Sequence, residues 1–393
     1  MPTINSRSSP VRLICIFFAP AIGCAAALPH PALEPAPGSP LPVAATCVAA
    51  GDFNGDHHPD LLVTVGNRLE TFLGDGSGRF KSAPDRDLDM GERASEIVVG
   101  DVNADGVLDA VTADHDRYPV SVFLGDGKGG FAAAPGSPFW PKHGDHPHTH
   151  GLIVCDVNND KIPDVVTANS ADGDIAVMLG DGHGHFAPAA RALFPCGRSP
   201  YPIAAADLNG DGNLDILVPN SEPGVRTLTV LLGDGTGAFT PAPGGPIPTA
   251  GNAYFVATGD LNGDGHPDAV LSHNEDDLAT VLLNDGHGRL RPSPASPLRL
   301  GNRGWYIVIT DFDHDGKADL ICATERSVRV FAGDGRGGFA ANPPVTPSGG
   351  RGCWKLAVAD LNGDGTPDVA TPNVESHDLT ILLSRRPSEA PRH

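Results

Sequence analysis

The sequence predicts an all-β fold made of seven repeats that close into a ring, and three observations predict it. A nine-residue pattern, Asp-x-Asn/Asp-x-Asp-x-x-x-Asp, returns every 49 to 55 residues, starting at Asp52, Asp101, Asp156, Asp207, Asp260, Asp311 and Asp360. Short apolar runs flank each copy, as expected of β-strands. The 49 Gly and 38 Pro suit many short strands joined by tight turns. Such a period is typical of a seven-bladed β-propeller with four antiparallel strands in each blade.

The fourth repeat shows how the elements of one blade follow each other. Apolar residues 202–206 precede the Asp-rich loop, and the compact apolar run 216–218 follows it. Residues 228–232 then alternate and end at a Gly-Asp-Gly turn that begins at Gly233. The Pro-rich segment 241–246 fits only an edge strand, because proline cannot donate to a strand ladder. Each repeat therefore predicts four strands, with the innermost first.

The two ends of the chain are expected to close the ring. The seventh repeat stops after its third strand, which ends at Leu383, while residues 36–41 closely copy residues 134–139. We therefore expect residues 36–43 to pair with the strand ending at Leu383, which leaves no free sheet edge. The propeller should span residues 36–384, with a short linker at 28–35 and a disordered tail at 385–393.

The N-terminus predicts export. Arg7 and Arg12 precede the apolar run 13–19, and small residues follow, so residues 1–27 fit a signal peptide. Cys24 ends a stretch that resembles a lipobox, so lipid attachment is the alternative to free secretion. We expect a secreted, periplasmic or cell-surface protein, without a transmembrane helix in the mature chain and monomeric. The net charge of −21 argues against nucleic acid as a partner.

The cysteines do not form a disulfide framework, because five scattered residues remain after the signal peptide. Cys47, Cys155 and Cys322 lie in predicted strands and should be buried. Cys196 and Cys353 lie in predicted loops, and whether they pair stays open.

The Asp-rich loops predict up to seven Ca²⁺ sites. Asp or Asn supplies oxygen at positions one, three, five and nine, and the carbonyl of position seven can add another, as calcium prefers. The alternative is Asx-turn chemistry, in which these side chains bond to their own backbone. Position six is Gly except for His57 and Lys161, so loops one and three should bind most weakly. The predicted ligands are Asp52, Asn54, Asp56, Asp60, Asp101, Asn103, Asp105, Asp109, Asp156, Asn158, Asp160, Asp164, Asp207, Asn209, Asp211, Asp215, Asp260, Asn262, Asp264, Asp268, Asp311, Asp313, Asp315, Asp319, Asp360, Asn362, Asp364 and Asp368.

These repeats resemble the FG-GAP/VCBS repeat family of integrin α head domains and exported bacterial proteins. Residues 207–215 and 230–239 carry the resemblance, which covers residues 36 to 384. The resemblance implies a calcium-binding, seven-bladed propeller with its Asp loops on the lower face and recognition on the upper face. Propellers of this kind include lectins, lyases and adhesion heads, so the fold does not settle the activity.

A ligand site is expected on the face opposite the Asp loops. Six residues before each leading Asp, the blades carry Thr46, Ser95, His150, Tyr201, Tyr254, Trp305 and Trp354. Aromatic rings of this kind suit sugar stacking or a protein hot spot, although they could instead plug the central channel. The candidate ligand-binding residues are His150, Tyr201, Tyr254, Arg303, Trp305, Arg351 and Trp354.

The segment from His143 to His150 interrupts the repeat. Its four histidines could bind a transition metal, or the segment could be a surface insertion. The leading functional hypothesis is a calcium-stabilised extracytoplasmic recognition or adhesion module for glycan or protein. A lyase-like enzyme acting on polysaccharide through His148 or His150, and a non-catalytic surface scaffold, are the alternatives; no motif supports a catalytic assignment.

Overall fold

The computed structural model describes residues 31–83, 88–90, 93–142, 144–146, 148–341 and 351–385. The expected signal peptide at 1–27, the first residues of the linker and tail residues 386–393 lie outside this part. The regular structure of the described residues consists of strands. Those residues contain no helix that could span a membrane.

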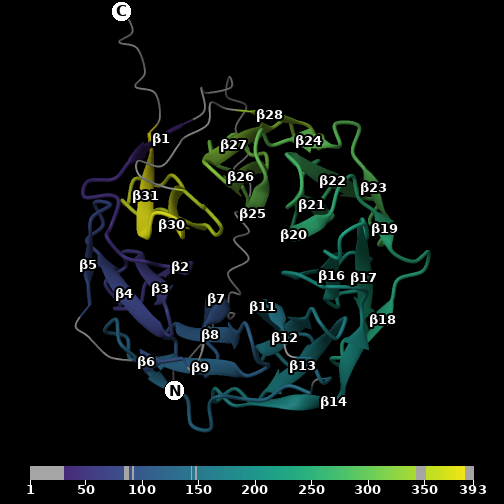
Figure 1. Ribbon diagram of the computed structural model, residues 1–393, viewed down its shortest axis with the longest axis horizontal. Helices are drawn as coiled ribbons and strands as arrows, with labels where there is room; N and C mark the ends of the chain where they lie inside the picture. The colour runs from purple at the N-terminus through teal and green to yellow at the C-terminus, as the bar shows by residue number, and fades with distance from the viewer. Residues whose placement is uncertain are drawn as a thin grey trace, which may run out of the picture.

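Seven antiparallel sheets form a ring of blades, with the first strand of each blade nearest the centre (Figure 1). The strands of blades one to three are β2 (Cys47–Gly51), β3 (Asp60–Val65), β4 (Arg68–Gly74), β5 (Phe80–Ser82), β6 (Leu88–Asp89), β7 (Ala94–Gly100), β8 (Asp109–Asp114), β9 (Val120–Gly125), β10 (Phe131–Ala133), β11 (Thr149–Cys155), β12 (Asp164–Asn169), β13 (Asp174–Gly180) and β14 (Phe186–Pro195).

The remaining strands repeat the same order. Those of blades four to seven are β15 (Ala204–Ala206), β16 (Asp215–Asn220), β17 (Thr227–Gly233), β18 (Phe239–Pro241), β19 (Ile247–Pro248), β20 (Ala253–Gly259), β21 (Asp268–His273), β22 (Leu278–Asn284), β23 (Leu290–Pro292), β24 (Leu298–Arg299), β25 (Gly304–Thr310), β26 (Asp319–Thr324), β27 (Val328–Gly333), β28 (Phe339–Ala341), β29 (Ala357–Ala359), β30 (Asp368–Asn373) and β31 (Asp378–Arg385). The predicted seven-bladed propeller is confirmed.

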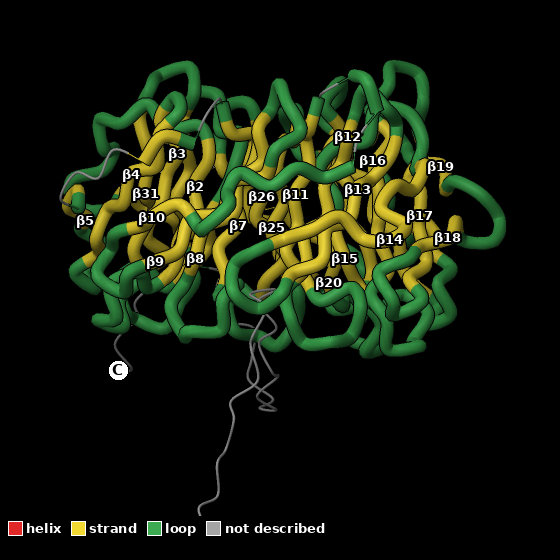
Figure 2. Tube along the Cα trace, turned by 90° about the horizontal axis from the view of Figure 1, so that it is seen from below, coloured by secondary structure: helices red, strands yellow, loops and turns green. Residues whose placement is uncertain are grey.

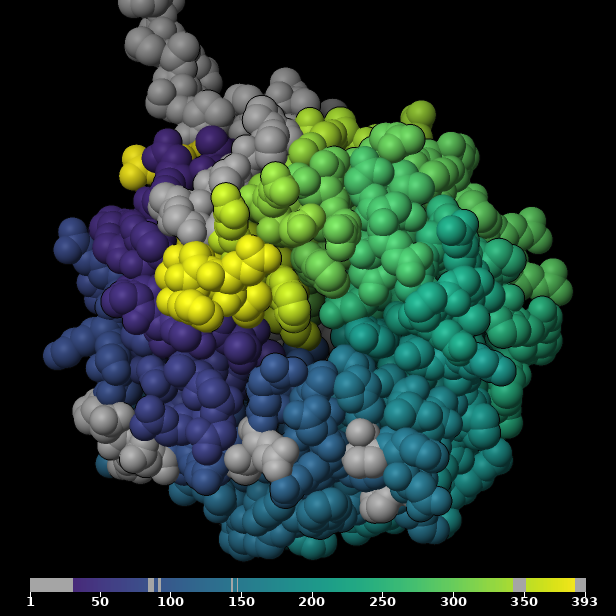
Figure 3. Space-filling model, in the orientation of Figure 1, coloured from purple at the N-terminus to yellow at the C-terminus, as the bar shows by residue number. Residues whose placement is uncertain are grey.

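The ring is closed by an N-terminal strand, as expected, but the strand starts earlier than predicted. β1 (Ala32–Pro35) pairs with β31, with Leu33 opposite Ser384. Residues 32–35, which we assigned to a linker, are thus part of the last blade, and Arg385 is its last strand residue rather than tail. Beyond β1, Leu41 forms a bridge with Leu379. The predicted segment, residues 36–43, therefore continues the pairing with β31 that β1 begins. In Figure 3 the last blade lies against the first.

The core lies between neighbouring blades. The second strands are buried almost throughout, because both of their faces pack on other sheets. One apolar cluster, for example, joins Leu217 and Leu228 of blade four to Val256, Leu271 and Leu282 of blade five. The loops gather on the two faces of this strand layer (Figure 2). All five described cysteines are buried and free, so Cys196 and Cys353 do not pair.

Candidate functional site: an aromatic row opposite seven Asp-rich loops

The ninth residue of each Asp-rich loop is a buried carboxylate that fastens the loop to its own blade. One oxygen accepts the N–H of position two, and the other accepts the N–H of the last residue of the third strand, or of the last but one in blade seven. All fourteen distances are 2.7 to 3.0 Å. The bonds join Asp60 to Phe53 and Gly74, Asp109 to Val102 and Gly125, Asp164 to Val157 and Gly180, Asp215 to Leu208 and Gly233, Asp268 to Leu261 and Asn284, Asp319 to Phe312 and Gly333, and Asp368 to Leu361 and Ser384.

Burial opposes the charge of these carboxylates. It raises the pKa of Asp109, Asp164, Asp215 and Asp268 to about 6, and that of Asp319 and Asp368 to about 7, while the backbone N–H bonds lower it. The pKa of Asp60 is raised for the same reason. A nearby cation would offset this cost, because it favours the ionised form.

Positions one, three and five show Asx-turn bonding within the loop. In the fourth loop, Asp207 Oδ2 accepts the N–H of Gly212 at 2.9 Å, and Asn209 Oδ1 accepts the N–H of Asp211 at 2.9 Å. Asn209 Nδ2 also donates to Asp211 Oδ2 at 3.0 Å. The expected alternative to metal binding is therefore present, although each carboxylate oxygen keeps a further lone pair for a cation.

The sixth loop brings three carboxylates together. Oxygen atoms of Asp311, Asp313 and Asp315 all lie within 4.8 Å of one another. This loop has Asp where the other six have Asn, and Lys317 Nζ donates to Asp315 Oδ2 at 2.7 Å. An all-oxygen set of this kind fits Ca²⁺ in its chemistry. The fit is strongest here, since five of the other loops use the Asn amide nitrogen against position five.

Position six is left-handed in all seven loops. The φ angles are 68° at His57 and 69° at Lys161, and 83° to 88° at Gly106, Gly212, Gly265, Gly316 and Gly365. A side chain in this conformation costs roughly 1–2 kcal/mol. At position six this cost falls on the first and third loops, while position four is left-handed at Ala104, Asn159 and His314 of the second, third and sixth loops.

A β-bulge positions the residues that we aligned on the opposite face. The register of the first strand shifts between Thr149 and Gly151, between Ala253 and Phe255, and between Gly304 and Tyr306. The bulged residues are thus His150, Tyr254 and Trp305. In blades four and seven, bridges at Pro200 and Cys353 put Tyr201 and Trp354 in the equivalent place. A bulge changes the direction of a side chain, so the residues at this aligned position of each blade all contribute to the same site.

The rings at these positions form one continuous series, which we call the aromatic row: His150, Tyr201, Tyr254, Trp305 and Trp354. His150 stacks on Tyr201 with ring centroids 4.1 Å apart. The next centroid distances are 4.7 Å to Tyr254, 5.1 Å to Trp305 and 5.4 Å to Trp354. Five residues from five consecutive blades therefore make a single aromatic surface.

The row covers five blades and ends at small polar residues in the other two. Thr46 Oγ1 contacts Thr64 Oγ1 at 2.8 Å, and Ser95 Oγ donates to the carbonyl of Ala113 at 3.2 Å. Because these side chains are short, the aromatic row forms an arc over five of the seven blades. Trp354, at one end of the arc, is 45% exposed, whereas the three rings before it are partly buried. Trp305 Nε1 is buried and has no hydrogen-bond partner among the described residues.

A buried ion pair crosses beside the open part of the arc. Lys355 Nζ of blade seven pairs with Glu96 of blade two, and the side chains are 16% and 10% exposed. Burial opposes the charge of Lys355, but Glu96, with smaller contributions from Cys47 and Tyr306, outweighs it and the pKa of the amine is raised. Lys355 also lies 5.2 Å from the ring centroid of Tyr306. The amine of Lys355 is therefore held in this pair.

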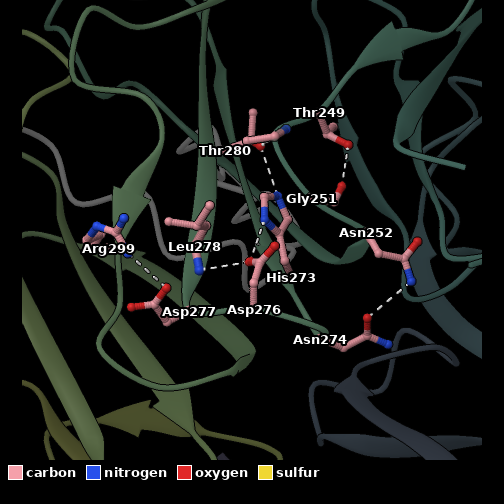
Figure 4. A network of polar contacts seen from close by, with 11 residues as sticks. Thr249, Gly251, Asn252, His273, Asn274, Asp276, Asp277, Leu278, Thr280 and Arg299 are labelled. Atoms are coloured by element: carbon pink, nitrogen blue, oxygen red, sulfur yellow. Dashed lines mark hydrogen bonds and ion pairs between the residues drawn. The ribbon is translucent and has the colours of Figure 1, made fainter. Parts of the chain in front are cut away.

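A polar network holds the chain that enters blade five (Figure 4). His273 is fully buried, and its ring bonds to Thr280 Oγ1 at 2.9 Å and to Asp276 Oδ1 at 3.2 Å. Burial lowers the pKa of His273. Asn252 Nδ2, two residues before Tyr254, donates to Asn274 Oδ1 at 3.2 Å and to the carbonyl of Ser221 at 3.1 Å. Through Asn252, the network fixes the chain that leads to Tyr254.

The predicted arginines lie at the rim of this face. Arg303 is 52% exposed and lies 3.9 Å from Glu325, while Arg198 pairs with Glu222 at 3.2 Å. Arg351 is exposed, and its backbone is held by Ser376 and Glu375. These guanidinium groups border the row but do not touch its rings in the described contacts.

The segment before the third blade contributes two histidines to a cluster whose third member, His115, was not predicted. His148 and His150 meet His115, which follows β8 of blade two. The sequence prediction missed His115, because this residue belongs to the preceding repeat. The signal that could have found it is a further histidine in the connection between the second and third strands of blade two. His143 lies outside the described residues.

A family model for the FG-GAP-like repeat matches residues 52–112, 101–167, 156–218, 222–271 and 311–371. These segments contain all seven Asp-rich loops and more than half of the chain. The protein belongs to the FG-GAP-like repeat family. The family and the propeller fold indicate a recognition or binding module. A comparison with curated proteins gave no match.

Similar solved structures show the same fold. An Agrocybe aegerita lectin, described as recognising non-reducing terminal N-acetylglucosamine, is 20% identical with a TM-score of 0.56, and 85% of this chain and 86% of the lectin are covered. BBS1N in complex with ARL6DN, from a crystal soaked with mercury, is 13% identical with a TM-score of 0.61, covering 91% and 98%. A lead-soaked crystal of the same complex gives 12% and 0.58, covering 90% and 94%. At these identities the likeness concerns the fold alone.

Proposed function

We propose that this protein is an extracytoplasmic, calcium-stabilised recognition module that binds a glycan through its aromatic row. The observation that carries the proposal is the unbroken contact of five rings from five blades, ending at an exposed tryptophan. A sugar ring presents C–H faces to an aromatic plane and hydroxyls to polar neighbours, so it suits an aromatic surface with a polar edge.

The surroundings of the row supply the polar part of such a site. The hydroxyls of Tyr201 and Tyr254 stay protonated, since burial raises the pKa of both phenols. Rim residues such as Arg303 and Arg351 can donate to hydroxyl or carboxylate oxygens. The N-acetylglucosamine-binding lectin with a similar fold adds support, because it shows what a propeller of this kind can recognise.

Calcium has a structural role in this proposal. The ions would be held by positions one, three and five of the loops, with position seven adding a carbonyl. The position-nine carboxylate, which we also counted as a ligand, fastens the loop in the arrangement described above. A bound ion would neutralise crowded carboxylates and so stabilise the blades from the face opposite the aromatic row.

Glycan-array binding with matched tryptophan variants tests the function. We expect Trp354→Ala to weaken binding about tenfold or more, because it removes the exposed ring of the row. Trp140→Ala is the control, since Trp140 is similarly exposed, at 52%, but follows the outer strand of blade two. Equal binding by wild type and Trp354→Ala, or equal losses in both variants, would contradict the site.

A protein partner is the other outcome of the same experiment. If the partner retains binding after enzymatic removal of its glycans, and Trp354→Ala still abolishes it, the aromatic row recognises protein instead. Release of unsaturated products from acidic polysaccharides would favour the lyase-like alternative.

A further inference from the structure

The histidine cluster, defined as His115, His148 and His150, has the geometry of a metal site. Each residue offers a ring nitrogen, and these atoms all lie within 4.8 Å of one another. The rings meet edge to face, with centroids 4.6, 4.8 and 4.3 Å apart for the three pairs. Three imidazoles from two blades therefore converge on one point.

We propose that the histidine cluster binds one transition-metal ion of the imidazole-preferring class, such as Zn²⁺, through three ring nitrogens. Neutral imidazole is a common ligand for zinc, copper and nickel. The Asp-rich loops offer only oxygen and lie on the opposite face, so this site is separate from the calcium loops. It also stands independently of glycan binding.

The first supporting feature is the carboxylate behind His115. Its Nδ1 lies 2.7 Å from Asp116 Oδ1, which orients the ring and leaves Nε2 for the metal. Metal-binding histidines commonly donate their other nitrogen to such a carboxylate. Asp116 is 58% exposed at its side chain, so it is not required for packing.

The second feature is the close approach of the other two ligands. His148 Nε2 and His150 Nε2 are 2.6 Å apart, which is a hydrogen bond with the proton between two ligand atoms. In a tetrahedral zinc site the two nitrogens would be about 3.3 Å apart, given Zn–N bonds of about 2.0–2.1 Å. If the rings of His148 and His150 moved slightly apart and carried their hydrogens on Nδ1, both Nε2 atoms could bind the ion.

The backbone favours the same role. The carbonyl of His115 accepts the N–H of Thr149 at 3.2 Å, and the carbonyl of His148 accepts the N–H of Ser170 at 2.7 Å. The first bond joins the two segments that carry the histidines, and the second fixes His148 to its own blade.

Three protein ligands leave the fourth tetrahedral position for water or a ligand group. His150 also stacks on Tyr201, so that position would lie at one end of the aromatic row.

Titration with Co²⁺ in excess Ca²⁺ tests the site, since calcium occupies the oxygen loops and Co²⁺ reports its coordination in visible absorption. We expect the full chain to bind one equivalent with the bands of four-coordinate cobalt, displaced by Zn²⁺. His115→Gln and His148→Gln should each weaken binding at least tenfold. His287→Gln, an exposed histidine on another blade, should change nothing.

Asp116→Asn tests the same site without changing a histidine, in case a histidine variant folds poorly. It should weaken Co²⁺ binding about 10- to 100-fold with unchanged circular dichroism. The proposal is overturned if wild type binds no Co²⁺ at micromolar concentrations, or if a variant lacking all three histidines binds with unchanged stoichiometry and affinity. Neither result would bear on glycan binding by the tryptophans.

Discussion

At the scale of the residue, the carboxylate at position nine makes the same two hydrogen bonds in all seven loops. Asp215 accepts one N–H from its own loop and one from the end of β17, so it joins two segments that are otherwise linked only through the strands. Both bonds are buried and charge-assisted, which makes each about 1.5–3 kcal/mol strong. The ninth position is thus needed by the fold whether or not a metal ion is bound.

Replacing this carboxylate should destabilise the protein even without calcium. Asp215→Asn puts an amide nitrogen against one of two buried N–H groups, and an unsatisfied buried donor costs roughly 1–3 kcal/mol. We expect a lower midpoint of thermal unfolding in a chelator. Asn209→Ala, in the same loop but partly exposed, is the control and should cost less. Equal midpoints of thermal unfolding for the two variants would contradict the structural role of Asp215.

At the scale of the element, the strand that closes the ring is only four residues long. Leu33 of β1 is 6% exposed and belongs to a cluster with Leu382, Val369 and Ile321 of blades six and seven. Its neighbour Glu34 is exposed and pairs with Arg385 at 2.9 Å. Adjacent residues of one strand therefore differ sharply in what they contribute.

Leu33→Ala should cost about 3 kcal/mol, in the range of buried leucine truncations. Glu34→Ala should cost well under about 1 kcal/mol, because exposed ion pairs contribute little. Denaturant unfolding of the two variants measures the difference. Equal, small effects would mean that β1 does not hold the ring closed.

At the scale of the whole molecule, seven similar loops should respond together to chelation. Removing Ca²⁺ leaves carboxylates crowded on one face, so we expect a lower unfolding temperature in a chelator and its recovery on adding Ca²⁺. Metal analysis of the untreated protein should find up to seven ions per chain, with loops one and three losing theirs first. An unchanged melting curve, with no bound metal, would count against calcium.

The repeat made this fold predictable, because each Asp-rich loop marks a fixed place between a first and a second strand. The bulged aromatics were predictable for the same reason: Tyr201 to Trp354 share one offset from the Asp residues. Contacts between repeats were harder to predict. Glu96 and Lys355 are 259 residues apart and meet only because the ring closes. His115 joins His148 only through the spacing between two blades.

The start of the closing strand was missed for a different reason. Residues 32–35 lack the apolar alternation of the other strands, with only Leu33 buried between exposed neighbours. The copied segment at 36–41 drew the prediction toward itself, since sequence similarity is easier to see than a single buried leucine. Ser39 Oγ nonetheless accepts the N–H of Ile381 at 2.9 Å, as Ser137 does for Val122, so the copied residues share their contact.

In four of the seven loops, the residue at position two also joins its blade to the next one. In the first loop, Phe53 gives its N–H to Asp60, while its carbonyl accepts the N–H of Gly129 from the second blade at 2.8 Å. Val157, Leu208 and Leu261 do the same toward Gly237, Gly288 and Gly337 of the blades that follow them. A disturbance at one of these loops therefore passes through a single residue to the hairpin turn of the next blade, so calcium binding at successive loops would be cooperative.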